Sequence, residues 1–275
     1  MTMLKKAFDF YINSSIHVSL AVVALALVTG FSLSIKLDVY FLIFLFCSSV
    51  SGYNFVKYAS VAGLHHRSLA RSLRSIQVFS VMCGLGMIFT GLVLRWETLL
   101  TCAILALFTL FYAVPLFLLK RNLRSIAGIK VFVIALVWAG TTVVLPVVEN
   151  GLELYWDVYI IALQRFLIVL TLMIPFEIRD LAYDTMALHT LPQVMGIKKV
   201  KLLGVSLLVI GFLLEYTIDD FKIQQIVILC IVLLILGFLI TLSRKRQPKY
   251  YASFIVEAVP IFWVILLSIA EDLIA

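Results

Sequence analysis

Apolar residues fill nine long stretches of this chain, and short polar segments separate them. Each stretch is close to the ~20 residues with which an α-helix crosses ~30 Å of hydrocarbon. The pattern therefore predicts nine membrane-spanning helices and no strands. Their expected positions are about 14–34, 38–56, 76–94, 97–118, 126–147, 158–177, 200–217, 223–242 and 251–271.

Composition supports a membrane protein over a soluble one. Of the 275 residues, 63% are hydrophobic and only 13% are charged, and the mean hydropathy is +1.13. A water-soluble fold of this length could not bury so much apolar surface. We find no soluble domain and no internal repeat, so we predict an all-α, polytopic membrane protein whose residues 1–275 form one transmembrane domain. The missing repeat also argues against a duplicated transporter.

Basic residues gather at alternate ends of the expected helices, which is the pattern that orients membrane proteins with positive loops inside. The intervening loops are mainly acidic, with residues such as Glu149, Glu153 and Asp157. The net charge of +7 is thereby explained without a nucleic-acid partner. We predict a cytoplasmic (inner) membrane, with the N-terminus in the cytoplasm and the C-terminus outside. The basic residues on the inner side are Lys5, Lys6, Lys57, Arg67, Arg71, Arg74, Lys120, Arg121, Arg124, Arg179, Lys198, Lys199, Lys201, Arg244, Lys245, Arg246 and Lys249.

One acidic cluster stands out on this basic side, in the run PFEIRDLAYDTMALHTLPQVMG at residues 175–196. At about 100° per residue, Glu177, Asp180 and Asp184 fall on one face of a helix. Clustered carboxylates repel one another unless a cation joins them, and oxygen ligands together with substrate phosphates suit Mg²⁺. The cluster predicts a metal and diphosphate site. The alternative is a solvated helix end that is paired with Arg179.

Two basic loops could hold the anion of such a site, because Arg and Lys bind phosphate oxygens. The same residues could equally serve topology and contact anionic lipid. Their coincidence with the acidic cluster is what favours binding. The loops contain His65, His66, Arg67, Arg71 and Arg74, and then Lys120, Arg121 and Arg124.

The sequence around these residues resembles the UbiA-type intramembrane prenyltransferases. The run EIRDLAYD followed by HTLPQVMG is similar to that family's second aspartate-rich motif, and LFYAVPLFLLKRN at residues 110–122 resembles its Tyr-x-x-Pro and Leu-Lys-Arg segment. Nine helices with an inner N-terminus are also the family's architecture. The resemblance implies that Asp180 and Asp184 bind Mg²⁺ and diphosphate and act in catalysis, that Glu177 supports them, and that Lys120 and Arg121 contact the diphosphate. Further candidates for substrate binding are Asn54, Arg74 and Tyr112.

The chain departs from this family at its first aspartate-rich motif. The corresponding stretch reads NFVKYASVA, where Asn54 is kept but Phe55, Tyr58 and Ala62 stand in place of three aspartates. We therefore expect the first metal site to be lost. Lys57 lies on another helical face and is expected to extend to the membrane surface.

Other charges inside the predicted spans are functional candidates by default. Arg165 and Glu257 could form an ion pair between helices or could contact substrate. Lys130 is expected to extend to the membrane surface. The four cysteines, Cys47, Cys83, Cys102 and Cys230, are expected to be small buried hydrophobes.

Two functional hypotheses remain open from the sequence. The first is a divergent prenyltransferase that moves a polyprenyl group from its diphosphate to an unidentified acceptor within the bilayer. The second is a catalytically inactive protein of the same fold that binds isoprenoid lipid or assists a partner enzyme. In either case we expect a lateral apolar cavity beside the inner ends of the second and sixth helices, near Asn54 and Asp180.

Overall fold

The computed structural model describes residues 3–58, 70–113, 128–182, 190–219 and 222–272. Every regular element within these ranges is a helix, as the sequence predicts. The elements are α1 Met3–Asn13, α2 Ile16–Leu33, α3 Val39–Tyr58, α4 Ala70–Gly91, α5 Trp96–Ala113, α6 Lys130–Ala139, η2 Gly140–Val144, α7 Leu145–Glu149, α8 Trp156–Asp180, α9 Leu191–Met195, α10 Ile197–Leu214, η4 Glu215–Thr217, α11 Ile223–Leu242, η5 Tyr251–Val256 and α12 Val259–Asp272.

Seven helical segments in the described part of the chain are long and apolar enough to cross a membrane. They are α2, α3, most of α4, the continuous α6–η2–α7 segment, α8, α11, and η5 with α12. The other two predicted spans coincide with α5, whose apolar part is shorter, and with α10, which has three lysines among its first five residues. An integral membrane protein built from helices is confirmed, whereas the count of nine crossings stays a prediction.

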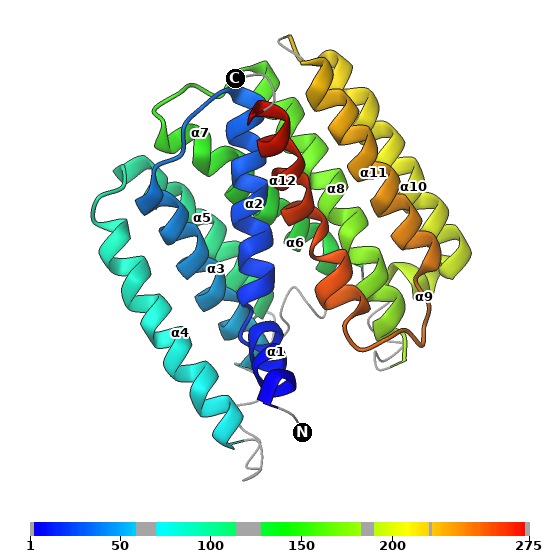
Figure 1. Ribbon diagram of the computed structural model, residues 1–275, viewed down its shortest axis with the longest axis horizontal. Helices are drawn as coiled ribbons and strands as arrows, with labels where there is room; N and C mark the ends of the chain where they lie inside the picture. Colours follow the sequence, from blue (N-terminus) through cyan, green and yellow to red (C-terminus); the bar gives the residue numbers. More distant parts are fainter. Residues whose placement is uncertain (1–2, 59–69, 114–127, 183–189, 220–221, 273–275) are drawn as a thin grey trace.

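The helices form one bundle with α2 and α12 between its two sides (Figure 1). On one side α3 packs against α4 and α5, and on the other α8 packs against α10 and α11, while α6 packs against α8. The N-terminus lies at one end of the bundle and the C-terminus at the opposite end. Opposite ends are what an odd number of crossings produces.

Close helix packing depends on small residues, as is usual in membranes, where burying apolar side chains from lipid gives little driving force. A Cβ atom on Gly204 of α10 would lie 2.6 Å from Ile174 Cδ1 of α8, and one on Gly140 would lie 2.6 Å from Leu105 Cδ2 of α5. The outer surfaces of α4 and α11 carry exposed apolar residues such as Phe89 and Leu234. Those surfaces suit lipid as their solvent.

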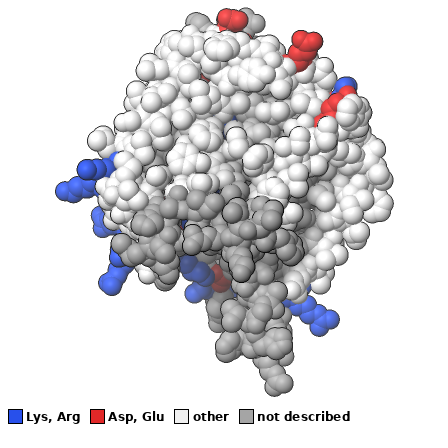
Figure 2. Space-filling model, turned by 180° about the vertical axis from the view of Figure 1, so that it is seen from behind, with Lys and Arg blue, Asp and Glu red and all other residues white. Residues whose placement is uncertain are grey.

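Charged residues are separated between the two ends of the bundle (Figure 2). On the face shown, lysines and arginines protrude mainly from one half, and most of the visible acidic residues lie at the far end. We call the first the basic end; there α1 begins, α3 and α8 end, and α6, α10 and η5 begin. The basic and acidic loops that alternate along the sequence thus lie at opposite ends of the folded bundle.

The four cysteines are free, but they are not all buried. Cys47 and Cys83 are buried where α3 packs against α4, as expected. Cys102 and Cys230 are partly exposed on α5 and α11. The predicted burial thus holds for these two only in part, although Cys102 still packs against the core cluster that contains Phe41 and Leu145.

Candidate functional site

Glu177 and Lys130 form an ion pair that joins α8 to α6 at the basic end. The distance from Lys130 Nζ to Glu177 Oε1 is 2.8 Å, and the Glu177 side chain is only 4% exposed. Lys130 was expected to extend to the membrane surface, and that prediction was wrong. A carboxylate buried at this depth needs a nearby positive charge, which the first residue of α6 supplies.

Asp180 is the last residue of α8, and its carboxylate pairs with the neighbouring guanidinium. Arg179 Nε lies 2.8 Å from Asp180 Oδ1, and the two side chains are partly exposed. The guanidinium also lies over the ring of Phe176, 5.2 Å from its centroid. Both contacts fit the alternative interpretation, a helix end paired with its own arginine. Asp184, the third carboxylate of the predicted face, lies outside the described residues.

At the end of α3, Asn54 is buried in a hydrogen-bond network that joins three helices. Its Oδ1 accepts from Ser15 Oγ at 2.8 Å, and its Nδ2 donates to the Ser14 carbonyl at 3.0 Å and to Ser80 Oγ at 2.7 Å. These bonds tie α3 to the start of α2 and to α4. The contacts indicate a structural role for the Asn54 amide, and its predicted contact with substrate remains a prediction.

Replacing Asn54 by leucine is expected to lower the free energy of unfolding by about 2–3 kcal/mol, because three hydrogen bonds are lost and buried polar partners remain. Thermal unfolding of the purified protein in detergent measures this. Asn150→Ala is the matched control, since the Asn150 amide makes one bond, to the Pro146 carbonyl, at the opposite end of the bundle. Equal stability of Asn54→Leu and the control would contradict the structural role.

The residues that stand in place of the first motif's aspartates, Phe55 and Tyr58, have other surroundings in the structure. Phe55 is largely exposed. The Tyr58 hydroxyl and the Lys57 ammonium both donate to the carbonyl of Asn13, each at 3.0 Å. Lys57 therefore turns toward the α1–α2 junction rather than simply extending to the membrane surface as predicted. Ala62 lies outside the described residues.

Glu257 and Arg165 do not form the ion pair that was considered. Glu257 lies within electrostatic range of Lys57 and Arg179, at the basic end. Arg165 is buried near the middle of α8, where Nη1 donates to the Leu25 carbonyl at 2.8 Å and the guanidinium lies 5.1 Å from the Trp263 ring centroid. Glu257 lies at the basic end and Arg165 nearer the middle of the bundle, so each interacts with different groups.

Four further candidates are less informative. Arg74 is exposed in the first part of α4. Tyr112 lies in the last turn of α5, and its side chain is outside the described part, as are Lys120 and Arg121. The residues that sequence reasoning undervalued are Lys57 and Lys130. The sequence pattern placed both lysines near the inner ends of predicted helices, but it did not show which groups they contact.

The carboxylates at the described part of the basic end do not fit a Mg²⁺ site. Glu177 is held by Lys130 and Asp180 by Arg179, so both are already neutralised by the chain itself. Across the described ranges, no three His, Cys, Asp or Glu side chains come together in a group that could hold a metal ion. The predicted metal site remains a prediction that depends on Asp184.

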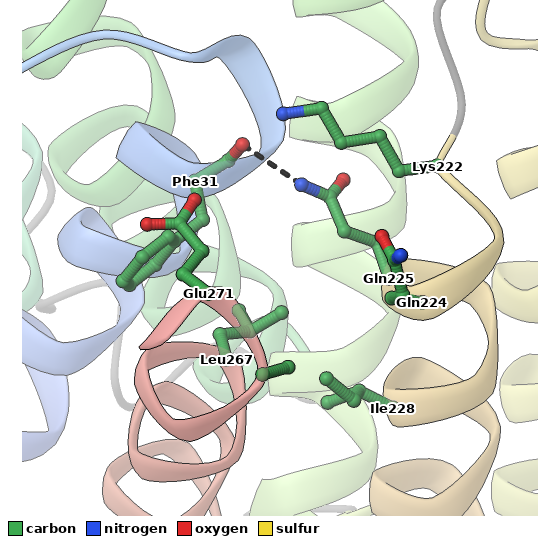
Figure 3. Close-up of a pocket in the computed structure, with 8 residues that line it drawn as sticks. Phe31, Lys222, Gln224, Gln225, Ile228, Leu267 and Glu271 are labelled. Atoms are coloured by element: carbon green, nitrogen blue, oxygen red, sulfur yellow. Dashed lines mark hydrogen bonds between the residues drawn. The ribbon is translucent and has the colours of Figure 1, made fainter. Parts of the chain in front are cut away.

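A cavity of about 420 Å³ lies at the opposite end of the bundle, between α2, α11 and α12 (Figure 3). Gln225 Nε2 donates to the Phe31 carbonyl at its rim, and Lys222 Nζ donates to Ser34 Oγ. Its walls carry one cation, Lys222, and one carboxylate, Glu271. Without an excess of positive charge, this cavity suits a diphosphate less well than the basic end does.

The fold is that of UbiA-type prenyltransferases. A solved UbiA homologue from Archaeoglobus fulgidus, described in complex with GPP and Mg²⁺, matches with a TM-score of 0.66 and 14% identity over 94% of this chain and 98% of that one. A solved digeranylgeranylglyceryl phosphate synthase matches with a TM-score of 0.56 and 17% identity over 96% and 98%. No protein-family model and no curated protein sequence matches.

Proposed function

We propose that this protein is a divergent intramembrane prenyltransferase, which moves a prenyl group from its diphosphate to an acceptor in the bilayer. The observation that carries the proposal is the position of the charged groups. On a UbiA-type fold, the ends of α3 and α8 bring Lys57, Glu177, Arg179 and Asp180 to the basic end, next to the start of α6. The structural neighbour with GPP supports a prenyl diphosphate as the substrate class.

The reaction breaks the bond between prenyl C1 and the diphosphate oxygen. A bond forms between C1 and a nucleophilic atom of the acceptor, which loses a proton, and inorganic diphosphate leaves with the electron pair of the broken bond. Positive groups stabilise the charge that develops on the departing oxygen, which is the largest contribution that such a site can make. The basic end of the bundle supplies these groups.

A second candidate is a protein of this fold that binds isoprenoid lipid without catalysis, or assists a partner enzyme. Its support is specific: three aspartates of the first motif are replaced, and Tyr58 is engaged with the Asn13 carbonyl. Position 58 thus carries a tyrosine that holds the α1–α2 junction, in place of a carboxylate that could bind a metal.

Labelled geranyl diphosphate separates the two candidates. Membranes that contain the overproduced chain are incubated with the probe and their own lipids as acceptors. Diphosphate release together with label in a larger lipid product supports transfer. Saturable binding without either product would leave the inactive, lipid-binding candidate, and the absence of both binding and turnover would contradict both.

The orientation of the protein is also a proposal, with the basic end in the cytoplasm. It is supported by the positive-inside rule and by the opposite positions of the termini. In a variant without native cysteines, a cysteine at Arg246 is expected to be protected from a membrane-impermeant thiol reagent in intact cells, and one at Glu153 is expected to react. Labelling of position 246 alone would reverse the proposed topology.

A further inference from the structure

Each described carboxylate at the basic end either forms an ion pair with a cation of the chain or lies within electrostatic range of one. Glu177 pairs with Lys130 and Asp180 with Arg179. Glu257 lies in range of Lys57 and Arg179. Asp9 accepts from Lys249 at 2.8 Å and from Tyr250, and the hydrogen bond from Lys249 is the main reason that the pKa of Asp9 lies below its usual value.

Lysines and arginines remain in excess once these pairs are made. Those in the described part include Lys198, Lys199, Lys201, Arg244, Lys245 and Arg246. An added divalent cation would therefore meet surroundings that are already positive, whereas an anion would be attracted. Within the described residues, the electrostatic preference of this end is opposite to that of a site that binds Mg²⁺ through free carboxylates.

We propose that Lys57, Lys130 and Arg179 supply the positive charge that Mg²⁺ provides in a metal-dependent site, so that this protein binds a prenyl diphosphate without a divalent metal. The inference rests on the proposed function, because it concerns the same site and substrate class. The three cations come from three helices that lie at the basic end: Lys130 of α6 pairs with Glu177 of α8, and Lys57 of α3 and Arg179 of α8 both lie within electrostatic range of Glu257. When a diphosphate binds, it replaces Glu177 as the partner of Lys130 and Asp180 as the partner of Arg179.

This exchange makes Glu177 a competitor of the substrate rather than a ligand of a metal. The two roles predict opposite effects for Glu177→Gln. If Glu177 competes, the variant removes the carboxylate that competes with the diphosphate for Lys130, and binding without metal is kept or becomes tighter. If Glu177 binds Mg²⁺, the variant weakens binding in the presence of Mg²⁺.

The double variant Lys130→Gln with Glu177→Gln tests the role of the cation. Because it removes both charges of the buried pair together, neither charge is left inside the protein without the other, which limits the damage to the fold. We expect its affinity for the diphosphate to fall at least about tenfold, which corresponds to about 1.4 kcal/mol. The matched control neutralises the ion pair at the opposite end of the bundle, Arg95 with Glu97, whose Nη2 and Oε1 lie 3.2 Å apart, and it should bind like the wild type.

The experiment is equilibrium binding of labelled geranyl diphosphate to the purified full chain in detergent, in EDTA and in Mg²⁺. Binding in EDTA that Mg²⁺ does not strengthen, with Glu177→Gln intact and the double variant weakened, is the expected result. Binding that requires Mg²⁺, or that Glu177→Gln abolishes, would overturn the inference and leave the proposed prenyltransferase standing. Undetectable binding in both conditions would contradict the proposed function itself, and wild-type affinity in the double variant would remove Lys130 from the site.

Discussion

Lys130→Met alone is expected to lower the free energy of unfolding by about 3–5 kcal/mol, the range found when one member of a buried ion pair is removed. The reason is the carboxylate that stays behind. Glu177 is buried between α6 and α8, and its Oε1 lies 2.8 Å from the ammonium that the substitution removes. Unfolding of the purified protein in mixed micelles with increasing SDS measures the change.

The double variant Lys130→Met with Glu177→Met should recover most of this loss, since apolar residues of similar volume replace a buried pair at little cost. Arg95→Gln is the matched single-residue control, because its ion pair with Glu97 is exposed and such pairs contribute about 0–1 kcal/mol. If Lys130→Met proves as mild as Arg95→Gln, then Glu177 does not depend on Lys130 in the folded protein.

Arg165→Ala is expected to be the other strongly destabilising change, by about 3 kcal/mol or more, because it opens a cavity among packed helices. Arg165 is 1% exposed and reaches from α8 to α2 and α12. Its guanidinium donates to the Leu25 carbonyl and lies over the Trp263 ring, while Nε makes no hydrogen bond. The same unfolding measurement applies.

The companion variant Arg165→Met separates packing from charge. Methionine fills much of the same volume without a desolvated charge. Glu215, the buried carboxylate within electrostatic range of Arg165, keeps its hydrogen bond from Gln164, so stability should stay within about 1 kcal/mol of the wild type. A methionine variant as unstable as the alanine variant would show that the hydrogen bond and the ring contact, rather than the filled volume, hold these three helices together.

The helical class and the positions of the membrane segments followed from local properties. Apolar stretches of the right length specify helices in a bilayer, because a backbone in hydrocarbon must satisfy its own hydrogen bonds. The alternating charge predicted two chemically different ends, and the folded bundle has them. The UbiA-type fold was also predicted, because the motif around Asp180 and the helix pattern could be recognised along the chain.

The local sequence pattern did not show which residue each buried polar group would contact. Glu177 pairs with a lysine 47 residues earlier in the chain. Glu257 lies within electrostatic range of Lys57 and Arg179, and Asn54 joins helices through its hydrogen bonds. Helical periodicity gives the face on which a residue lies, but not the helix that this face meets. A charge in the bilayer takes the nearest opposite charge or hydrogen-bond acceptor that packing offers. The sequence by itself therefore determined the class of protein and the separation of its charges between two ends, while only the tertiary structure decided that Glu177 and Asp180 are already paired with cations of the chain.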